Sequence, residues 1–536
     1  MSDPDDLKVH VVVVGSGAGG LAGAIGAAQA GARVTVLERS PQLGGTTAIS
    51  GGVVWIPDAA APDGQSSRAA ALTYLAHLIP TESDRHLVEA YVDQASRVLR
   101  ERLADIAGLR LVAFPTPDYH PELPGGVTAG RSFGPVDFRP TVDALGPYLN
   151  VIREAPFRMQ WINDARAEDG WWQAGRALVG TLVAAAHRLG VELRTDARVT
   201  SLNTADGAVV GLSGEDSSGD PFAVAADAVI LASGGFEHSP RLLEQHFGFT
   251  FDAPMSPPWN EGDGLIMAQD VGADVSNLNG AWWTPVFHVG GETQDHSRAF
   301  RSTNHVRALP GTILVNARGQ RFVDEARSYN VVGRAMAEFD PAAANYPNRK
   351  AWLIFGGEFM PRYGVAAFGD LEMDASWSLT ADSLETLGLR AGIDPNGLVR
   401  TVADWNLDMA RGRDSAFHRG ENYYDRYQGD QDLIDSPSAS LAAIADGPYT
   451  AVRVFLGALG TKGGPRVDSH GRVLGPRQGP IPGLYAAGNV ASSVMRAAYA
   501  GGGATIGPAL TFGYLAGEHA AARHISSLAV AAAPTA

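Results

Sequence analysis

The chain of 536 residues contains no cysteine. This absence excludes disulfides, cysteine-ligated zinc, iron–sulfur clusters and a thiol nucleophile. Any redox chemistry must therefore take place on an organic cofactor. The sequence also lacks a long apolar run, because Gly, Arg or Asp interrupts every candidate, and it predicts no integral membrane segment. The histidines show no spacing typical of metal ligands, so we predict no metal site.

Positive charge is scarce as well. Lys and Arg number 42 against 58 Asp and Glu, and the net charge of -16 disfavours nucleic acid and anionic membranes as partners. The acidic start, Met1–Asp6, runs straight into a strand and does not resemble a secretory or transit peptide. We expect a cytoplasmic protein, with peripheral membrane contact left open for a lipid substrate. The length predicts two or more domains.

The head of the chain has the pattern of a βαβ unit. The β-branched run Val9–Val14 predicts a buried parallel strand, the alanine-rich Leu21–Ala30 predicts a helix, and Arg33–Leu37 predicts a second strand. Similar strand signals recur at 191–193, 208–212 and 228–232.

The middle of the chain differs in composition from both ends. Residues 281–457 have more Trp, Tyr and Asp, and they include a polar helical section around 403–427. The last eighty residues return to Gly- and Ala-rich sequence. We therefore predict an α/β fold in which an α+β cap domain is inserted into a Rossmann-like nucleotide-binding domain, with divisions at 1–286, 287–458 and 459–536.

A glycine motif joins the first strand to the helix. Gly15 makes the tight turn, Gly17 lets the backbone approach a pyrophosphate, and Gly20 lets the helix lie close to the strand, as in G-x-G-x-x-G. The helix N-terminus then faces the phosphates. Glu38 closes the second strand, where a carboxylate accepts hydrogen bonds from ribose hydroxyls.

Small residues continue beyond this motif and favour FAD over NAD. Gly44–Gly52 lets the backbone lie against a long flat ligand, which an NAD enzyme does not need. Ala232–Gly235 and Tyr485–Asn489 supply two further matches. The predicted FAD contacts are Gly15, Ser16, Gly17, Ala18, Gly19, Gly20, Glu38, Arg39, Gly45, Thr46, Thr47, Ser50, Gly51, Gly52, Val199, Ala232, Ser233, Gly234, Gly488, Asn489, Thr505 and Ile506.

Two sequence patterns resemble those of the fumarate reductase/succinate dehydrogenase flavoprotein superfamily. They are Gly44–Gly52 together with Asn260–Gly264, and the stretch Asn316–Glu325. The resemblance implies that the substrate lies between the cap and the flavin ring. Members that reduce dicarboxylates carry an arginine soon after the last stretch. In this chain the corresponding stretch, 325–329, ends in a tyrosine instead, Tyr329. Arg327 lies within the stretch, which leaves open whether it serves as that arginine.

A longer match lies near the C-terminus. The segment Met495–Tyr514, with Asp118–Gly126, resembles the 3-ketosteroid Δ1-dehydrogenases. The resemblance implies FAD-dependent 1,2-dehydrogenation of a 3-ketosteroid to the 1-ene-3-one, with hydride transfer to flavin N5. It implies four catalytic residues: Tyr329 as the base for the α proton, Tyr119 as its assistant, and the Tyr499 hydroxyl with the Gly503 N–H as donors to the ketone oxygen.

The chemistry suits these residue types. Two convergent donors make an oxyanion site. A tyrosine titrates near pH 10, so Tyr329 needs activation by a neighbour or raised pH. We infer that Tyr119 activates it through a hydrogen bond. The alternative is that these tyrosines are ordinary half-buried packing residues without a catalytic role.

Other interpretations stay open at this point. A smaller cyclic ketone of the cyclohexanone type is the second candidate, because Arg496 can narrow the pocket or bind a carboxylate, or else face solvent. A flavin-dependent reductase of an unsaturated acid is the third. Trp282, Trp283 and Phe287 can line an apolar cleft or belong to the core. We expect a hydrophobic ketone as substrate and a quinone-like molecule or carrier protein as electron acceptor.

Overall fold

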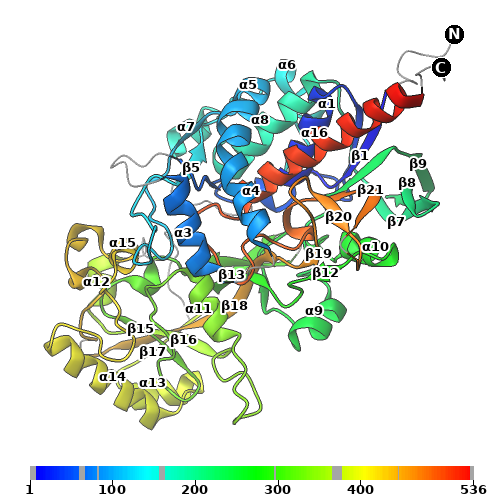
Figure 1. Cartoon of the computed structure of the whole chain (residues 1–536). Coiled ribbons are helices and arrows are strands. Elements are labelled where there is room, and N and C mark those ends of the chain that lie inside the picture. Colours follow the sequence, from blue (N-terminus) through cyan, green and yellow to red (C-terminus); the bar gives the residue numbers. More distant parts are fainter. Residues whose placement is uncertain are drawn as a thin grey trace.

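The computed structural model describes the chain in several stretches and divides it into two lobes (Figure 1). The upper lobe holds both ends of the chain around a parallel sheet, and the lower lobe holds the middle of the chain. The described residues are 8–59, 67–80, 84–155, 163–294, 297–364, 368, 377–444, 446–477 and 479–531.

A six-stranded sheet forms the centre of the upper lobe, in the order β20-β21-β10-β1-β2-β6. Every neighbouring pair is parallel except β20 with β21. The β-branched strand β1 is completely buried, as a central parallel strand must be. This confirms the predicted α/β fold. The strands are β1 (His10–Val14), β2 (Arg33–Leu37), β6 (Glu192–Arg194), β10 (Ala228–Leu231), β20 (Arg472–Leu474) and β21 (Pro480–Ala486).

Helix α1 (Ala18–Gln29) joins β1 to β2 and begins three residues before the predicted start. Helix α16 (Ile506–Ala531) lies beside it, so the first and last helices of the chain are neighbours (Figure 1). Glycines make this contact close. A Cβ on Gly513 would lie 2.2 Å from the Gly19 carbonyl oxygen, and one on Gly517 would lie 1.9 Å from the Gly23 carbonyl oxygen.

One predicted strand belongs to a different sheet. Residues 208–212 fall in β8 (Ala208–Asp216), which pairs antiparallel with β7 (Ala197–Ala205) and β9 (Pro221–Ala225) outside the parallel sheet. A short apolar run does not distinguish parallel from antiparallel pairing.

Smaller elements complete the upper lobe. The strands are β3 (Val54–Trp55), β4 (Leu111–Ala113), β5 (Ser132–Pro135), β12 (Val275–Ser276) and β19 (Gly464–Pro465). The helices are α2 (Gly45–Ala48), α3 (Arg68–Leu78), α4 (Arg85–Ser96), η3 (Arg97–Arg102), α5 (Leu103–Ala107), α6 (Val142–Leu145), η4 (Gly146–Tyr148), α7 (Asp164–Glu168), α8 (Ala174–Arg188), α9 (Pro240–Phe247), α10 (Asp263–Asp270) and η9 (Gly488–Val490).

A second sheet supports the lower lobe, with the order β14-β13-β18-β16-β15 and with β11 and β17 also paired to β18. The predicted domain boundaries at 286/287 and 458/459 fall inside β13 and β18, and the division into domains stays a prediction. The strands are β11 (Ala253–Pro254), β13 (Ala281–Gln294), β14 (Ser297–Ser302), β15 (Thr312–Asn316), β16 (Ala351–Phe355), β17 (Ser378–Ala381) and β18 (Tyr449–Thr461).

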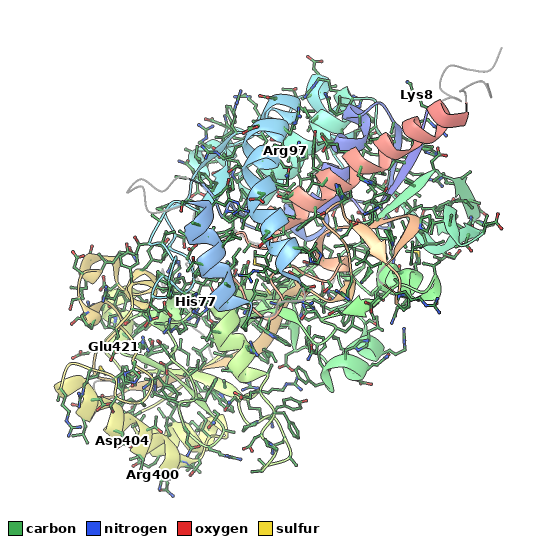
Figure 2. All side chains as sticks on the ribbon, viewed as in Figure 1. Lys8, His77, Arg97, Arg400, Asp404 and Glu421 are labelled. Carbon is green, nitrogen blue, oxygen red and sulfur yellow. The ribbon has the colours of Figure 1, made fainter. Side chains whose placement is uncertain are left out.

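The polar section predicted as helical around 403–427 contains the end of one helix, a turn and the start of another. On α14 (Pro395–Ala410), Trp405 is buried, whereas Arg400 and Asp404 are exposed at the outer edge (Figure 2). The remaining helices are η5 (Val306–Ala308), α11 (Tyr329–Met336), α12 (Phe359–Tyr363), α13 (Leu384–Ala391), α15 (Tyr423–Gln428), η7 (Gln431–Leu433) and η8 (Pro437–Ala439). Within the described stretches, no helix combines the length and apolar character needed to cross a membrane.

The α1–α16 contact leads to a stability prediction. Gly513→Ala should lower the free energy of unfolding by about 1–3 kcal/mol, because the added methyl group meets the Gly19 carbonyl oxygen and the two helices must separate. Thermal unfolding of the FAD-loaded protein measures the change. Gly479→Ala is the matched control, since its added Cβ meets no atom within 4 Å. Equal unfolding temperatures for Gly513→Ala and the unmodified chain would contradict this account of the contact.

Candidate active site

A pocket extends from the carboxyl ends of β1, β2 and β10 to strand β13 and helix α15 of the lower lobe. Such an edge is where ligands bind in open parallel sheets. Of the predicted FAD contacts, all except Gly20 line this pocket. The four residues predicted to be catalytic, Tyr119, Tyr329, Tyr499 and Gly503, line it as well.

The three motif glycines have different surroundings. Gly15 has a φ of +103°, and its Cβ would lie 2.4 Å from the Ala232 carbonyl oxygen. Gly20 lies away from the pocket, where its Cβ would meet the Gly15 carbonyl oxygen at 1.9 Å. At Gly17 the nearest atom to an added Cβ is Thr47 Oγ1 at 3.7 Å, so the protein itself leaves this position open. A ligand that approaches the backbone explains why Gly17 carries no side chain.

Glu38 is 9% exposed and closes the turn beside the motif. Its Oε2 accepts hydrogen bonds from the Ser16 backbone N–H at 3.0 Å and the Ser16 hydroxyl at 2.6 Å. Its Oε1 accepts from the Ser40 N–H at 2.9 Å. These bonds fix the carboxylate at the pocket wall. The open backbone at Gly17, the N-terminus of α1 and this carboxylate together fit the pyrophosphate and ribose of a dinucleotide.

The Asn-Glu-Gly-Asp-Gly stretch also reaches this pocket. The Asn260 amide donates to Glu237 Oε1 at 2.7 Å and to Thr46 Oγ1 at 3.3 Å. Asp263 accepts from Arg39 Nη1 at 3.1 Å. Glu237 is completely buried, and the sequence alone gave it no role. Its Oε2 also accepts from the Thr461 N–H at 2.9 Å, so Glu237 links the end of β18 to the pocket residue Asn260.

The three predicted tyrosines meet at the junction of the two lobes. The Tyr119 hydroxyl donates to the Tyr329 hydroxyl at 3.0 Å, and the Tyr329 hydroxyl donates to the Tyr499 hydroxyl at 2.9 Å. Their ring centres lie 5.0–5.5 Å apart in edge-to-face contacts. The bond from Tyr119 to Tyr329 is the one that the sequence led us to expect.

Burial disfavours the charged form of each of these phenols. It raises the pKa of Tyr329 well above the usual value, and the neighbouring Tyr119 and Tyr499 raise it further. Burial also raises the pKa of Tyr119 well above the usual value, and it raises the pKa of Tyr499 against the opposing effect of hydrogen bonds from Tyr329 and Thr505. All three hydroxyls are therefore neutral at neutral pH.

Gly503 lines the same pocket as the three tyrosines and lies in the left-handed region, with a φ of +92°. A Cβ there would lie 2.5 Å from the Val53 carbonyl oxygen. Among the described residues, none accepts a hydrogen bond from the Gly503 N–H. An oxyanion site needs two donors, and this pocket offers the Gly503 N–H and the Tyr499 hydroxyl.

Comparison with known proteins agrees with this geometry. Residues 10–506 match the family model described as FAD binding domain. The chain is 37% identical to 4-oxocyclohexanecarboxylate 2-dehydrogenase of Sinomonas cyclohexanicum, over 95% of this chain and 92% of the relative. It is 34% identical to 3-oxosteroid 1-dehydrogenase of Mycobacterium tuberculosis, over 96% of this chain and 98% of that protein.

A solved structure gives the same result. The 3-ketosteroid Δ1-dehydrogenase from Sterolibacterium denitrificans, in complex with 1,4-androstadiene-3,17-dione, superposes with a TM-score of 0.85 at 32% identity, covering 96% of this chain and 99% of that one. The chain therefore belongs to the FAD-binding flavoprotein family that includes these dehydrogenases. It is an FAD-dependent oxidoreductase of the 3-ketosteroid or cyclic ketone dehydrogenase type, which acts on CH–CH groups.

Arg496 and Arg327, the two arginines that the sequence offered as pocket cations, both lie outside the pocket. Arg496 contacts Asp84 and donates to Ser276 Oγ at 2.6 Å, so it does not narrow the pocket. Arg327 donates to Glu122 Oε1 at 2.6 Å. Neither Arg496 nor Arg327 therefore acts as a pocket arginine. A contact with a residue hundreds of positions away in the chain is not visible in a local sequence pattern.

Of the three aromatic residues considered for the cleft, Trp282 alone lines the pocket. Its ring centre lies 4.8 Å from that of Tyr499, and its Nε1 donates to Asn489 Oδ1 at 3.0 Å. Trp283 contacts Phe251 at 5.0 Å in a separate core. Phe287 stacks on another core tryptophan of the lower lobe.

The sequence gave no role to two further groups near the tyrosines. Lys462 is 1% exposed, and its Nζ lies 4.2 Å above the Trp282 ring and donates to the Ala498 carbonyl at 3.0 Å. Burial lowers the pKa of this lysine well below its usual value. Asp118 pairs with Arg131 at 2.7 Å and accepts from Trp55 Nε1 at 2.8 Å, which fixes the backbone next to Tyr119. A buried lysine and a buried ion pair are recognisable only once burial is known.

The opening at Gly17 leads to a prediction about the cofactor. Gly17→Ala should leave the unfolding temperature of the apoprotein unchanged, because the protein has room for the methyl group, and should weaken FAD binding about tenfold or more, because the methyl group takes the space for the pyrophosphate. Titration of apoprotein with FAD, followed by flavin fluorescence, measures the affinity. Gly479→Ala should bind FAD normally. Unchanged affinity in Gly17→Ala would remove Gly17 from the phosphate site.

Proposed function

We propose that this flavoprotein removes two hydrogens from adjacent carbons next to a ring ketone, with Tyr329 as the base. The observation that carries the proposal is the chain of hydrogen bonds from Tyr119 through Tyr329 to Tyr499. Introducing a double bond beside a ketone needs a base for the α proton, donors for the enolate oxygen and an acceptor for the β hydride. Bound FAD supplies that acceptor at N5 of its ring.

Each group of the protein has one task in this reaction. Tyr499, through its hydroxyl, and Gly503, through its N–H, hold the ketone oxygen and stabilise the negative charge that develops on it. Tyr329 takes the α proton, so the C–H bond breaks while its electrons form the enolate double bond. Tyr119 donates to the Tyr329 hydroxyl at 3.0 Å and orients it for the proton transfer.

Two substrate classes are candidates. A 3-ketosteroid, converted to the 1-ene-3-one, is favoured by the relatives that are named for this reaction. A smaller cyclic ketone is favoured by the relative of 37% identity, named for 4-oxocyclohexanecarboxylate. A reductase of an unsaturated dicarboxylic acid needs several cations in the pocket. Among the described residues, the pocket is lined by one arginine, Arg39, whose charge is already paired with Glu261 and Asp263.

Tyr329→Phe should lower kcat by about 10²-fold or more and leave FAD and ligand binding intact, since only the base is lost. Because burial raises the pKa of Tyr329, kcat/KM of the unmodified enzyme should rise about tenfold per pH unit near neutral pH. The variant should lack this rise. Stopped-flow flavin reduction measures both effects. Tyr346→Phe, which removes a hydroxyl bonded to the Phe247 carbonyl, is the control. Near-normal reduction in Tyr329→Phe would exclude Tyr329 as the base.

Anaerobic mixing of the FAD-loaded enzyme with single compounds tests the reaction class. Androst-4-ene-3,17-dione or a cyclohexanone should bleach the flavin, because both present hydrogens next to a ketone, and succinate should not. Bleaching by succinate alone would contradict the ketone reaction. The electron acceptor, a quinone-like molecule or a carrier protein, and the cytoplasmic location remain proposals.

A further inference from the structure

The backbone donor of the proposed ketone site belongs to a tight turn, residues 501–504. The Ala504 N–H donates to the Gly501 carbonyl at 3.1 Å, so Gly502 and Gly503 are the two central residues of this turn. Of these two, only Gly503 has a positive φ, of +92°. A positive φ at the third residue and not at the second is the pattern of a type II turn.

The sequence of this turn also permits the opposite orientation of its central peptide group. Between type I and type II turns, ψ of the second residue and φ of the third change by about 150–170°, which turns over the peptide group between them. Here that peptide group joins Gly502 to Gly503. Because glycine adopts positive and negative φ about equally readily, two central glycines allow both forms. The turn alone therefore does not determine which way the Gly503 N–H points.

A buried hydroxyl beside the turn holds the central peptide group in one orientation. Ser132 begins strand β5 and is 1% exposed, and its Oγ donates to the Gly502 carbonyl at 2.9 Å. No other described group donates to that carbonyl. In a planar trans peptide, the carbonyl of one residue and the N–H of the next point in opposite directions. The bond from Ser132 therefore directs the Gly503 N–H away from β5.

The orientation of this peptide group decides which atom the turn offers to a ligand. Gly502 and Gly503 line the pocket, whereas Ser132 does not. In the type II form, the Gly503 N–H is available as a donor, since no described residue accepts from it. In the type I form, the Gly502 carbonyl oxygen would take its place, and its partial negative charge would repel an enolate oxygen.

Other side chains hold the preceding part of the same loop by its carbonyls. Lys462 Nζ donates to the Ala498 carbonyl at 3.0 Å, and the Tyr74 hydroxyl donates to the Ala500 carbonyl at 2.6 Å. These bonds fix the loop on both sides of the catalytic tyrosine that it carries. The bond from Ser132 differs from them, because the carbonyl that it holds shares a peptide group with the proposed oxyanion donor.

We propose that Ser132 is a positioning residue for the dehydrogenation, whose hydroxyl selects the type II form of the turn and so presents the Gly503 N–H to the ketone oxygen. Ser132 acts through the peptide group between Gly502 and Gly503 and does not itself line the pocket. The inference rests on the proposed function, because it assigns Ser132 to the step that forms the enolate. The enolate oxygen carries more negative charge than the ketone oxygen, so the orientation affects the transition state more than substrate binding.

Ser132→Ala removes the hydroxyl without adding an atom. Stopped-flow reduction of the FAD-loaded enzyme by a ketone that the unmodified enzyme oxidises measures the effect. The limiting rate should fall about tenfold or more, toward the 10²–10³-fold loss typical of a missing oxyanion donor. The half-saturating ketone concentration and the FAD affinity should change less than about twofold, because the lost interaction acts in the transition state. Ser213→Ala, which removes a hydroxyl bonded to Asn203 between β7 and β8, is the matched control and should keep the rate.

Deuterium on the α carbons of the ketone separates positioning from a general loss of structure. Slower enolate formation makes cleavage of the α C–H bond more rate-limiting, so the isotope effect on flavin reduction should be at least as large in Ser132→Ala as in the unmodified enzyme. A displaced flavin would instead slow hydride transfer and diminish this isotope effect. An unchanged limiting rate in Ser132→Ala, or a slower rate with a smaller isotope effect, overturns the positioning role while the dehydrogenation stands. If no ketone reduces the flavin of the unmodified enzyme, the proposed function itself fails.

Discussion

The hydrogen bonds that join the hydroxyls of Tyr119, Tyr329 and Tyr499 cross the junction of the two lobes, and the architecture of the site depends on them. Tyr119, Tyr329 and Tyr499 come from a loop of the upper lobe, the first turn of α11 and a loop before α16. A shift of either lobe would leave at least one hydroxyl buried without a partner, at a cost of about 1–3 kcal/mol. The hydrogen bonds therefore fix the lobes relative to each other at the place where the chemistry occurs.

The same burial has opposite effects on two parts of the proposed reaction. A dry site strengthens the donors that hold an enolate oxygen, because charge interactions are screened less there. It also makes a phenolate harder to form, as the raised pKa of Tyr329 shows. The site thus combines strong enolate binding with a base whose phenolate form is disfavoured.

Local patterns in the sequence were sufficient to predict the parts of the fold that local forces determine. Strand β2 has the predicted bounds, and the glycine loop lies between β1 and α1 as the motif requires. The run at 208–212 was also recognised as a strand, but the pattern did not show that it pairs antiparallel with its sequence neighbours β7 and β9, outside the parallel sheet.

For the candidate site too, residues within long motifs were predicted from the sequence, and isolated residues were not. The tyrosines were found because long motifs surround them, and the pocket brings all of them together. Lys462, Glu237 and Ser132 were missed, since each is an ordinary polar residue until its burial is known. The role of Arg496 stayed open because its partner, Asp84, lies more than 400 positions away in the chain. Charge in a sequence gives no indication of which way a side chain faces.

The close contact between α1 and α16 also has a consequence for how the protein is made. The glycine loop leaves the ribosome among the first residues, whereas Gly488, Asn489, Thr505 and Ile506, which line the same pocket, follow nearly 500 residues later. The parallel sheet likewise waits for β21, which pairs with β10. A nascent chain therefore exposes the incomplete sheet throughout most of its synthesis, and capture of the cofactor is one of the last events in its maturation. Premature termination anywhere before α16 yields a polypeptide with a phosphate loop but no enclosed flavin site.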